Sequence, residues 1–188
     1  MYTGKKIILG SQSPRRLEIL RDAGFEVEIV KPKVEEKFPA GLQINKIAEY
    51  LSKLKMYDVF SFIGSDNELI ICADTMVIFQ NKLVGKPKNE ETAFRYLKAL
   101  NGQKHEVVTG VTMRYKGKQL SFTELSTVSF KHLEDDEIKK FIANNEVLDK
   151  AGAYNVQEYI GVSKVEGDFY NVMGLPLKQV LHELKQLM

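Results

Sequence analysis

Residues 69–79 constrain the fold more than any other segment, because they are apolar almost throughout, with three Ile residues, one Val and one Cys. A run of this length and composition predicts a β-strand that is buried on both faces. A single carboxylate, Asp74, interrupts the run. Burying a carboxylate without a partner is costly, so we expect Asp74 to face a cleft, a cation or a hydrogen-bond network.

Two interpretations of Asp74 follow from this position. At the wall of a cleft, one carboxylate can hold a divalent ion or take a proton from an attacking water. The alternative is a structural aspartate that is hydrogen-bonded to a turn. We favour the functional interpretation, because structural aspartates prefer the turns at strand ends.

Around this strand, strand-like and helix-like patterns alternate along the chain. Ser13 and Pro14 are typical of a helix start, as N-cap and first helical residue, and Gly24 is typical of a helix end. Two long β segments separated by a turn at residues 116–118 predict a hairpin. This mixture of hairpins and βα units predicts an α/β fold with a mixed sheet. The expected strands are 6–10, 26–30, 69–79, 83–85 (after a turn at Asn81 and Lys82), 105–115 and 119–132, and the expected helices are 14–23, 44–59, 90–100, 134–144 and 176–187.

The length of 188 residues fits a single domain, 1–188, with room for two lobes around a cleft. The composition, 44% hydrophobic and 28% charged, is ordinary for a globular protein and argues against disorder. A net charge of +2 is too small to indicate a nucleic-acid or membrane partner. The apolar run 7–9 is too short for a signal-peptide core, and no later stretch is long enough to span a bilayer. We therefore expect a cytoplasmic protein with neither a membrane nor a nucleic-acid partner.

Cysteine and histidine usage excludes several kinds of site. Cys72 is the only cysteine, so no intrachain disulfide is possible, and its apolar neighbours indicate a buried thiol rather than a catalytic thiolate. The three histidines, His105, His132 and His182, show no ligand spacing, so a structural zinc site is not expected. The chain also lacks glycine-rich phosphate loops and the nucleophile-elbow motif.

The first candidate for an anion site is the segment 11–16, with the sequence SQSPRR. A strand ends here and a helix begins, and the free N–H groups of a helix start attract anions. Arg15 and Arg16 add planar donors that suit phosphate oxygens, and Ser11 and Ser13 add hydroxyl groups. The alternative is an ordinary capped helix with two solvated arginines, and for this segment taken alone that is the better interpretation.

Two further segments carry polar groups beside small residues. In the GKP sequence at 85–87, the turn could aim Lys86 into a site where it neutralises phosphate charge, although a turn lysine is usually just solvated. In the sequence DKAGAYNVQ at 149–157, the amide of Gln157 offers both a donor and an acceptor to a base. The alternative for this segment is a tight helix or turn packed against the sheet.

The order and spacing of six motifs resemble the Maf family over nearly the whole chain. They are SQSPRR at 11–16, ADT at 73–75, GKP at 85–87, GQKHEVVTG at 102–110, DKAGAYNVQ at 149–157 and GLP at 174–176. The resemblance implies a two-lobed, mixed α/β fold around a long twisted sheet, related to inosine-triphosphate pyrophosphatases, with a nucleotide in the cleft. It also implies hydrolysis of a nucleoside triphosphate to the monophosphate and pyrophosphate, with Mg²⁺ or Mn²⁺ as cofactor.

Roles for individual residues follow from the same resemblance. Asp74 looks like the family's proton acceptor. Glu36 resembles an acidic loop residue that helps hold the metal together with Asp74, and Glu35 is a close alternative for this role. With the polar groups of the first segment included, the expected substrate-binding residues are Ser11, Ser13, Arg15, Arg16, Lys55, Thr75, Lys86 and Gln157.

The DT pair after Ala73 and the DKAGAY sequence resemble the branch of the family that acts on dTTP and UTP, so we expect pyrimidine triphosphates as substrates. Glu158 follows the motif residue Gln157, where the family often has Gly. This departure puts the expected base preference in question more than the expected reaction, because it lies in the loop around the base. One alternative is a purine-directed pyrophosphatase of the inosine-triphosphate type. Another is a non-enzymatic regulator of cell division, since the family name derives from an effect on septum formation. Under that alternative, SPRR would be a contact patch and Asp74 structural. By resemblance alone we also expect a homodimer.

Overall fold

The computed structural model describes residues 4–188; residues 1–3 of the expected domain 1–188 lie outside the described residues. The strands are β1 (Lys6–Gly10), β2 (Glu26–Ile29), β3 (Ile70–Phe79), β4 (Lys82–Val84), β5 (Lys104–Tyr115), β6 (Lys118–Phe130) and β7 (Val162–Glu166). They form one sheet in the order β2-β1-β3-β5-β6-β7, and β4 pairs with part of β3. β1 is parallel to β2 and β3, whereas the other neighbours are antiparallel. The predicted mixed α/β sheet is therefore confirmed.

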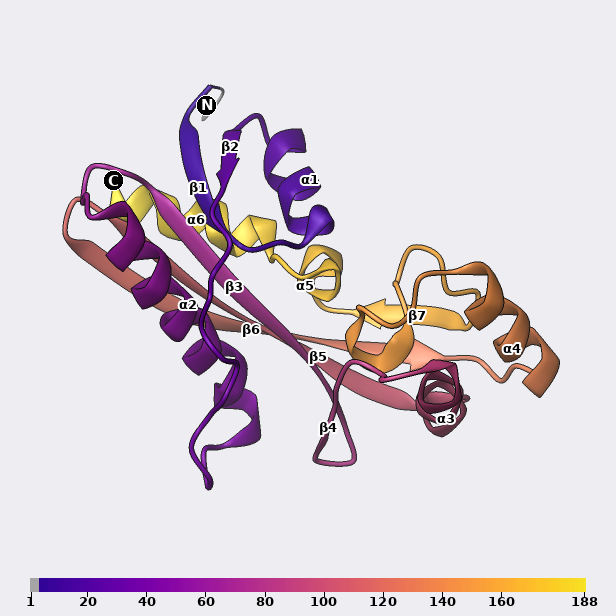
Figure 1. Ribbon diagram of the computed structural model, residues 1–188. Helices are drawn as coiled ribbons and strands as arrows, with labels where there is room; N and C mark the ends of the chain where they lie inside the picture. Colours follow the sequence, from indigo (N-terminus) through magenta and orange to yellow (C-terminus); the bar gives the residue numbers. More distant parts are fainter. Residues whose placement is uncertain (1–3) are drawn as a thin grey trace.

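The long strands β3, β5 and β6 cross the whole molecule, and the helices gather at their two ends, which makes two lobes (Figure 1). One lobe holds β1, β2, α1, α2 and α6, and the other holds β4, β7, α3 and α4. In this view α2 lies in front of the sheet and α6 behind it. The helices are α1 (Pro14–Asp22), α2 (Ile47–Ile63), α3 (Glu90–Leu100), α4 (Asp135–Asn144), α5 (Phe169–Met173) and α6 (Leu177–Leu187), with short 3₁₀ turns η1 (Ile44–Lys46) and η2 (Ala151–Ala153).

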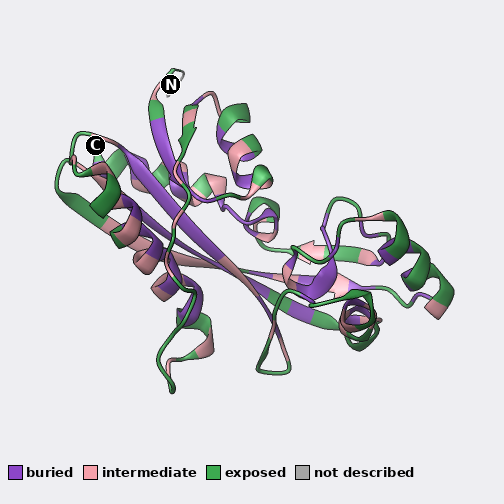
Figure 2. Ribbon diagram, viewed as in Figure 1, coloured by how far each residue is buried: buried purple, intermediate pink, exposed green. Residues whose placement is uncertain are grey.

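The first half of β3 is buried on both faces, as its apolar sequence predicts (Figure 2). Side chains of a strand point alternately to opposite faces. Ile70 and Cys72 accordingly pack in the cluster that α2 covers, and Ile71 and Ala73 pack in the main core on the other face. By the same alternation, Asp74 points to the α2 face and Thr75 to the opposite one.

The sheet is split beside Asp74. On one edge of β3, pairing with β1 ends at Cys72, and pairing with β4 begins at Val77. The other edge is paired continuously with β5 from Ile70 to Ile78. Residues 73–76 therefore have a strand neighbour on one side only, and the gap between β1 and β4 exposes them to a cleft.

Gly110 permits the close approach of α2 to this part of the sheet. It is the β5 partner of Asp74 in the register. A Cβ atom at Gly110 would lie 2.1 Å from the backbone nitrogen of Glu49 and 2.3 Å from the carbonyl carbon of Ala48. Since backbone atoms cannot yield as a flexible side chain can, only glycine fits at this crossing.

The structure differs from the predicted elements in three places. Helix α2 continues to Ile63 and ends at Gly64, whose φ of +66° suits glycine. The turn before β4 is made by Gln80 and Asn81, both with positive φ, rather than by Asn81 and Lys82. Strand β7 and helix α5 were not predicted, because β7 is a short, mostly exposed strand and α5 has only five residues. Within residues 4–188, no helix has both the length and the apolar character that a membrane crossing requires.

Candidate active site

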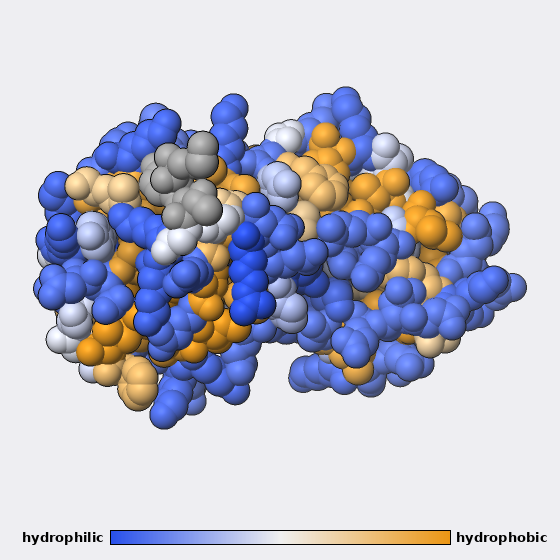
Figure 3. All heavy atoms as spheres, turned by 90° about the horizontal axis from the view of Figure 1, so that it is seen from above, coloured by the Kyte–Doolittle hydropathy of each residue, from blue (hydrophilic) through white to orange (hydrophobic). Residues whose placement is uncertain are grey.

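The split in the sheet opens into a cleft of about 540 Å³. Its walls come from the segment between β1 and α1, the middle of β3, the β4 region, and the segments that contain residues 149–156 and 172–174. Seen from above, the molecule narrows between its two lobes (Figure 3). Of the substrate-binding residues predicted from the sequence, the cleft is lined by Ser11, Ser13, Arg15, Arg16, Lys55, Thr75 and Lys86.

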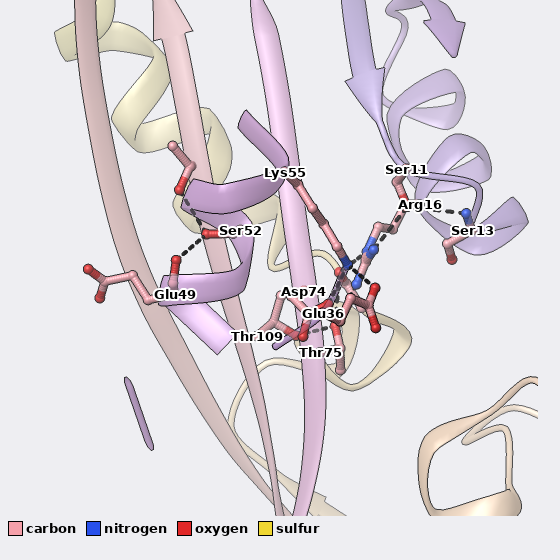
Figure 4. Close-up of polar contacts among 12 residues, drawn as sticks. Ser11, Ser13, Arg16, Glu36, Glu49, Ser52, Lys55, Asp74, Thr75 and Thr109 are labelled. Carbon is pink, nitrogen blue, oxygen red and sulfur yellow. Dashed lines mark hydrogen bonds and ion pairs between the residues drawn. The ribbon is translucent and has the colours of Figure 1, made fainter. Parts of the chain in front are cut away.

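Lys55, Asp74 and Glu36 converge at one end of this cleft (Figure 4). Lys55 reaches down from α2 and donates a hydrogen bond to Oδ1 of Asp74. The same ammonium lies 2.7 Å from Oε1 of Glu36, which is on the loop between β2 and α2. The side chains of Lys55 and Asp74 are each only 10% exposed, whereas that of Glu36 is 51% exposed. One cation is thus shared by a buried and a half-exposed carboxylate.

The two carboxylates differ in their electrostatic environment. Burial raises the pKa of Asp74 above its ordinary value, although the charges of Lys55 and Arg16 act in the opposite direction. Burial also acts to raise the pKa of Glu36, but the hydrogen bond and charge of Lys55, with the charges of Lys86 and Arg16, hold it below its ordinary value. A carboxylate with a raised pKa binds a proton more readily than one in water.

Arg16 is a buried cation that neutral oxygen atoms hold in place. Its Nη1 donates to Oγ of Ser11 at 2.9 Å, its Nη2 to Oγ1 of Thr75 at 2.9 Å, and its Nε to the carbonyl oxygen of Gly174 at 2.7 Å. Among the ion pairs of the described residues, none involves Arg16. Burial lowers the pKa of Arg16, while the charge of Asp74 acts to raise it. The positive charge of Arg16 is therefore only partly compensated and favours an anion in the cleft.

Arg15 and Lys86 offer freer cationic groups on opposite sides of the cleft. Arg15 is half-buried at the start of α1, and its one hydrogen bond, from Nε to the carbonyl oxygen of Met173, is 3.4 Å long. Lys86 is exposed and follows β4. The N-terminus of α1 lies in the same wall as Arg15. There, Ser11 Oγ accepts a hydrogen bond from the backbone N–H of Ser13 at 3.2 Å. Ser13 occupies the N-cap position as predicted, but its side chain makes no capping hydrogen bond, and Arg16 is buried rather than solvated. The segment therefore differs from an ordinary capped helix with two solvated arginines and faces the cleft.

Farther from Asp74, the cleft wall combines apolar side chains with the polar residues Asp149, Lys150 and Asn155. The apolar side chains in this part of the wall are those of Val77, Leu83, Val84, Val107, Tyr154 and Val156. Tyr154 is held by a hydrogen bond of 2.7 Å between its hydroxyl group and Nε2 of His105. The cleft therefore joins a charged end to a more apolar end, an arrangement that suits an amphiphilic anion with an aromatic part.

The predicted base-reading residue, Gln157, is exposed and does not line the described cleft. Its backbone N–H donates to Oδ1 of Asn155, a buried residue that does line the cleft. Lys150, in the same segment, also lines the cleft, although no role was predicted for it. Asn155 and Lys150 sit within the 149–157 motif, but the motif alone does not indicate which side chains point inward.

Two carboxylates at the charged end fit a divalent cation that is shared with a ligand. Glu36 and Asp74 both contact Lys55, so their oxygen atoms lie near one another. No cluster of three or more acidic, His or Cys side chains is found within residues 4–188. Mg²⁺ is commonly held by one or two carboxylates plus substrate phosphates, so this donor set suits it. Glu35, the alternative to Glu36, instead pairs with Lys37 and is exposed.

The fold and the cleft define an α/β protein with a cleft between two lobes that is lined by several cationic side chains. The solved structure of the Staphylococcus aureus Ham1 protein has a similar fold, with a TM-score of 0.55 and 15% identity over 96% of this chain and 100% of that chain. At this identity the likeness concerns the fold alone.

The sequence identifies the family as well as the fold. The family model described as Maf-like protein matches residues 6–187. The chain belongs to the Maf family. A relative from Porphyromonas gingivalis, named dTTP/UTP pyrophosphatase, is 43% identical over 96% of this chain and 93% of its own length. Relatives of the same name from Cytophaga hutchinsonii and Bacteroides thetaiotaomicron are 43% and 42% identical, over 96% and 97% of this chain and 84% and 96% of their own lengths.

Proposed function

We infer that the protein is a nucleoside triphosphate pyrophosphatase that acts on dTTP and UTP and releases the monophosphate and pyrophosphate. The relatives named dTTP/UTP pyrophosphatase, which are 42–43% identical over nearly the whole chain, support this assignment. The single structural observation that carries it is the position of Asp74. This buried carboxylate faces a cleft beside Lys55 and Glu36, with the Arg16 charge on the adjoining wall.

A nucleoside triphosphate matches the polarity of the cleft. Its phosphates would lie at the charged end, near the N-terminus of α1 and between Arg15, Lys55 and Lys86. Its base and sugar would lie toward the apolar end, beside Val77 and Tyr154. A cleft of about 540 Å³ is within the range of small-molecule sites.

In the mechanism that fits this geometry, Asp74 accepts a proton from a water molecule that attacks phosphorus. Its raised pKa makes it a better proton acceptor than an exposed carboxylate. Lys55 holds the carboxylate in place, and Arg15 and Lys86 offset the charge on the phosphates as pyrophosphate leaves. Positioning and electrostatics contribute most of the rate in phosphoryl chemistry of this kind.

A divalent cation, Mg²⁺ or Mn²⁺, completes the proposal. Glu36 and Asp74 are the residues that would hold it, because their oxygen atoms are hard ligands near the phosphate end of the cleft. When bound, the cation would neutralise phosphate charge and polarise the phosphorus–oxygen bonds. In its absence the two carboxylates share the single positive charge of Lys55.

The test is release of pyrophosphate from a panel of nucleotides, dTTP, UTP, dCTP, ITP and GTP, with Mg²⁺ or Mn²⁺. Wild type should turn over dTTP and UTP, and Asp74→Asn should be slower by about 10²-fold or more, as expected on losing a general base. Asp66→Asn is the matched control, because this exposed carboxylate pairs with Arg114 away from the cleft.

Three results would contradict the proposal in different ways. Faster hydrolysis of ITP than of dTTP or UTP would indicate the purine-directed alternative. Normal turnover by folded Asp74→Asn would show that Asp74 is not the base. No turnover of any nucleotide by folded wild type would favour the non-enzymatic regulator.

A further inference from the structure

Thr109 lies beneath the Arg16 site and is fully buried on β5, opposite Thr75 in the strand register (Figure 4). Its hydroxyl group donates a hydrogen bond to the carbonyl oxygen of Asn171 at 3.0 Å. It also lies 2.9 Å from Oγ1 of Thr75. A hydroxyl group has one proton, so when Thr109 donates to Asn171 it accepts in this second bond and Thr75 donates. Thr75 Oγ1 also lies 3.4 Å from the carbonyl oxygen of Gly174, a contact too long to compete with the bond to Thr109.

The direction of the hydrogen-bond chain follows from this assignment. Since the Thr75 proton is directed to Thr109, its remaining lone pairs are available to Arg16, whose Nη2 donates to Oγ1 at 2.9 Å. The chain therefore runs from Arg16 through Thr75 and Thr109 to the carbonyl group of Asn171. Linked bonds of this kind polarise one another in a buried setting.

Thr109 also contacts the turn that carries the second acceptor of Arg16. The carbonyl oxygen of Asn171 accepts from the hydroxyl group of Thr109 and from the backbone N–H of Gly174 at 2.9 Å. This turn at the end of α5 presents the carbonyl oxygen of Gly174 to Nε of Arg16 at 2.7 Å. Two of the three acceptors of Arg16 are thus connected by hydrogen bonds to this one buried hydroxyl group.

We propose that Thr109 is a positioning residue for the phosphate end of the cleft, because its hydroxyl group orients Thr75 and the Gly174 turn that together hold Arg16. The effect on turnover rests on the proposed function. Thr109 itself does not line the described cleft, so it acts through Arg16 and Thr75, which do. Arg16 has no carboxylate partner that would keep its guanidinium group aligned if these neutral acceptors moved.

The chain supplies a matched control on the same strand. Thr112 is also fully buried on β5, and its hydroxyl group lies 2.7 Å from Ser52 Oγ and 3.0 Å from Ser121 Oγ, away from the cleft. Thr109→Val and Thr112→Val each replace a hydroxyl group by a methyl group at a fully buried position. A general loss of packing or stability would affect both variants alike.

The experiment compares kcat/KM for dTTP and melting temperature in these two variants. Thr109→Val should lose about tenfold or more, as expected when a hydrogen bond that orients a charged group is removed, while Thr112→Val stays near wild type at a similar melting temperature. Thr109→Ser, which keeps the hydroxyl group, should restore most of the activity. In an Arg16→Lys background, Thr109→Val should cost little more, because coupled residues are not additive.

Three kinetic outcomes would overturn the positioning role. The first is near-normal kcat/KM for Thr109→Val, and the second is an equal loss in Thr112→Val. The third is a full additional loss of activity when Thr109→Val is combined with Arg16→Lys.

A second readout separates this inference from the proposed function. The Nε–H resonance of Arg16 reports its bond to the Gly174 carbonyl group without any reaction, and its protection from solvent exchange should fall in Thr109→Val and persist in Thr112→Val. If wild type hydrolyses no nucleotide but this difference is present, the positioning role stands and the proposed function fails. Equal protection in both variants would refute the positioning role whatever the activity.

Discussion

Lys55 on α2 and Asp74 on β3 form an ion pair in which each side chain is only 10% exposed. A buried pair is costly to desolvate, so it gives little net stability unless further contacts support it. Here the same ammonium group also binds Glu36, at 2.7 Å. The Lys55 ammonium group therefore contacts the same two carboxylates that we propose as ligands of a divalent cation. Substitution of Lys55 thus tests the proposed metal site directly.

Replacing Lys55 by Met should separate metal binding from catalysis. Without the ammonium group, Asp74 and Glu36 lose the cation that competes for their oxygen atoms, so Mn²⁺ should bind the free protein more tightly. Turnover should fall by about 10²-fold or more, since a charge-stabilising donor is lost. Titration calorimetry with Mn²⁺ and steady-state kinetics measure the two effects. Lys53→Met is the control, because Lys53 pairs with Glu49 on the same helix. Weaker Mn²⁺ binding in Lys55→Met would count against a metal held by Asp74 and Glu36.

Glu36 and Glu35 are adjacent in sequence but differ in their partners. Glu36 faces Lys55 and the cleft, whereas Glu35 pairs with Lys37 at the surface. Glu36→Gln should raise the Mg²⁺ concentration for half-maximal turnover by about tenfold, because one anionic ligand is lost. Glu35→Gln should leave it unchanged. Metal titrations of initial rates measure this, and equal shifts in both variants would show that Glu36 has no special role.

Gly110→Ala should destabilise the fold and disturb Lys55. The added Cβ atom would meet the α2 backbone at 2.1 to 2.3 Å, so the helix that carries Lys55 must move away from the sheet. We expect a loss of about 3 kcal/mol or more in the free energy of unfolding, at the upper end for overpacking. Gly85→Ala is the control for stability, since nothing lies within 4 Å of a Cβ atom there. Urea unfolding measures both variants, and comparable stabilities would refute the close-contact explanation.

His105 should make the protein less stable in mild acid. Burial lowers its pKa from 6.5 to about 4. Between these values the unfolded chain binds a proton that the folded protein does not, so stability falls as the pH drops from about 6.5 towards about 4. At pH 5 the loss from this residue is about 2 kcal/mol.

Comparing urea unfolding at pH 7 and pH 5 isolates this contribution. His105→Gln should lose about 2 kcal/mol less than wild type over this interval, because the glutamine does not titrate. His182→Gln, at an exposed position on α6, should behave as wild type. If His105→Gln kept the full acid dependence, the destabilisation would have to come from other groups.

Much of the secondary structure follows from sequence pattern, because hydrophobic periodicity and capping signals are local. The apolar run around Asp74 is confirmed as the central strand β3, and the hairpin of β5 and β6 forms around Lys116 and Gly117, both with positive φ. Elements stabilised mainly by distant contacts escaped prediction. Helix α5 has five residues, and the bonds of Asn171 with Thr109, Val107 and Ser126 hold it against the sheet.

The candidate site divides in the same way. Sequence alone pointed to Asp74, because a carboxylate inside an apolar strand must find a partner. The apolar pattern could not name that partner, since Lys55 and Glu36 are 19 and 38 positions away in the numbering, and only the family resemblance grouped Glu36 with Asp74. The sequence alone also treated Arg15 and Arg16 as alike, whereas the fold buries Arg16 among neutral acceptors and leaves Arg15 freer at the cleft.

By itself the sequence determined the family, the strand that carries Asp74, and the alternation that sends Asp74 and Thr75 to opposite faces. The tertiary structure alone decided what covers each face, because the packing of α2 over Gly110 and of α5 against β5 depends on contacts between segments far apart in the chain. Those contacts bring Lys55 to Asp74 on one face and Arg16, Thr109 and Gly174 to Thr75 on the other. Local pattern specifies a residue's direction, and only long-range packing specifies what it meets.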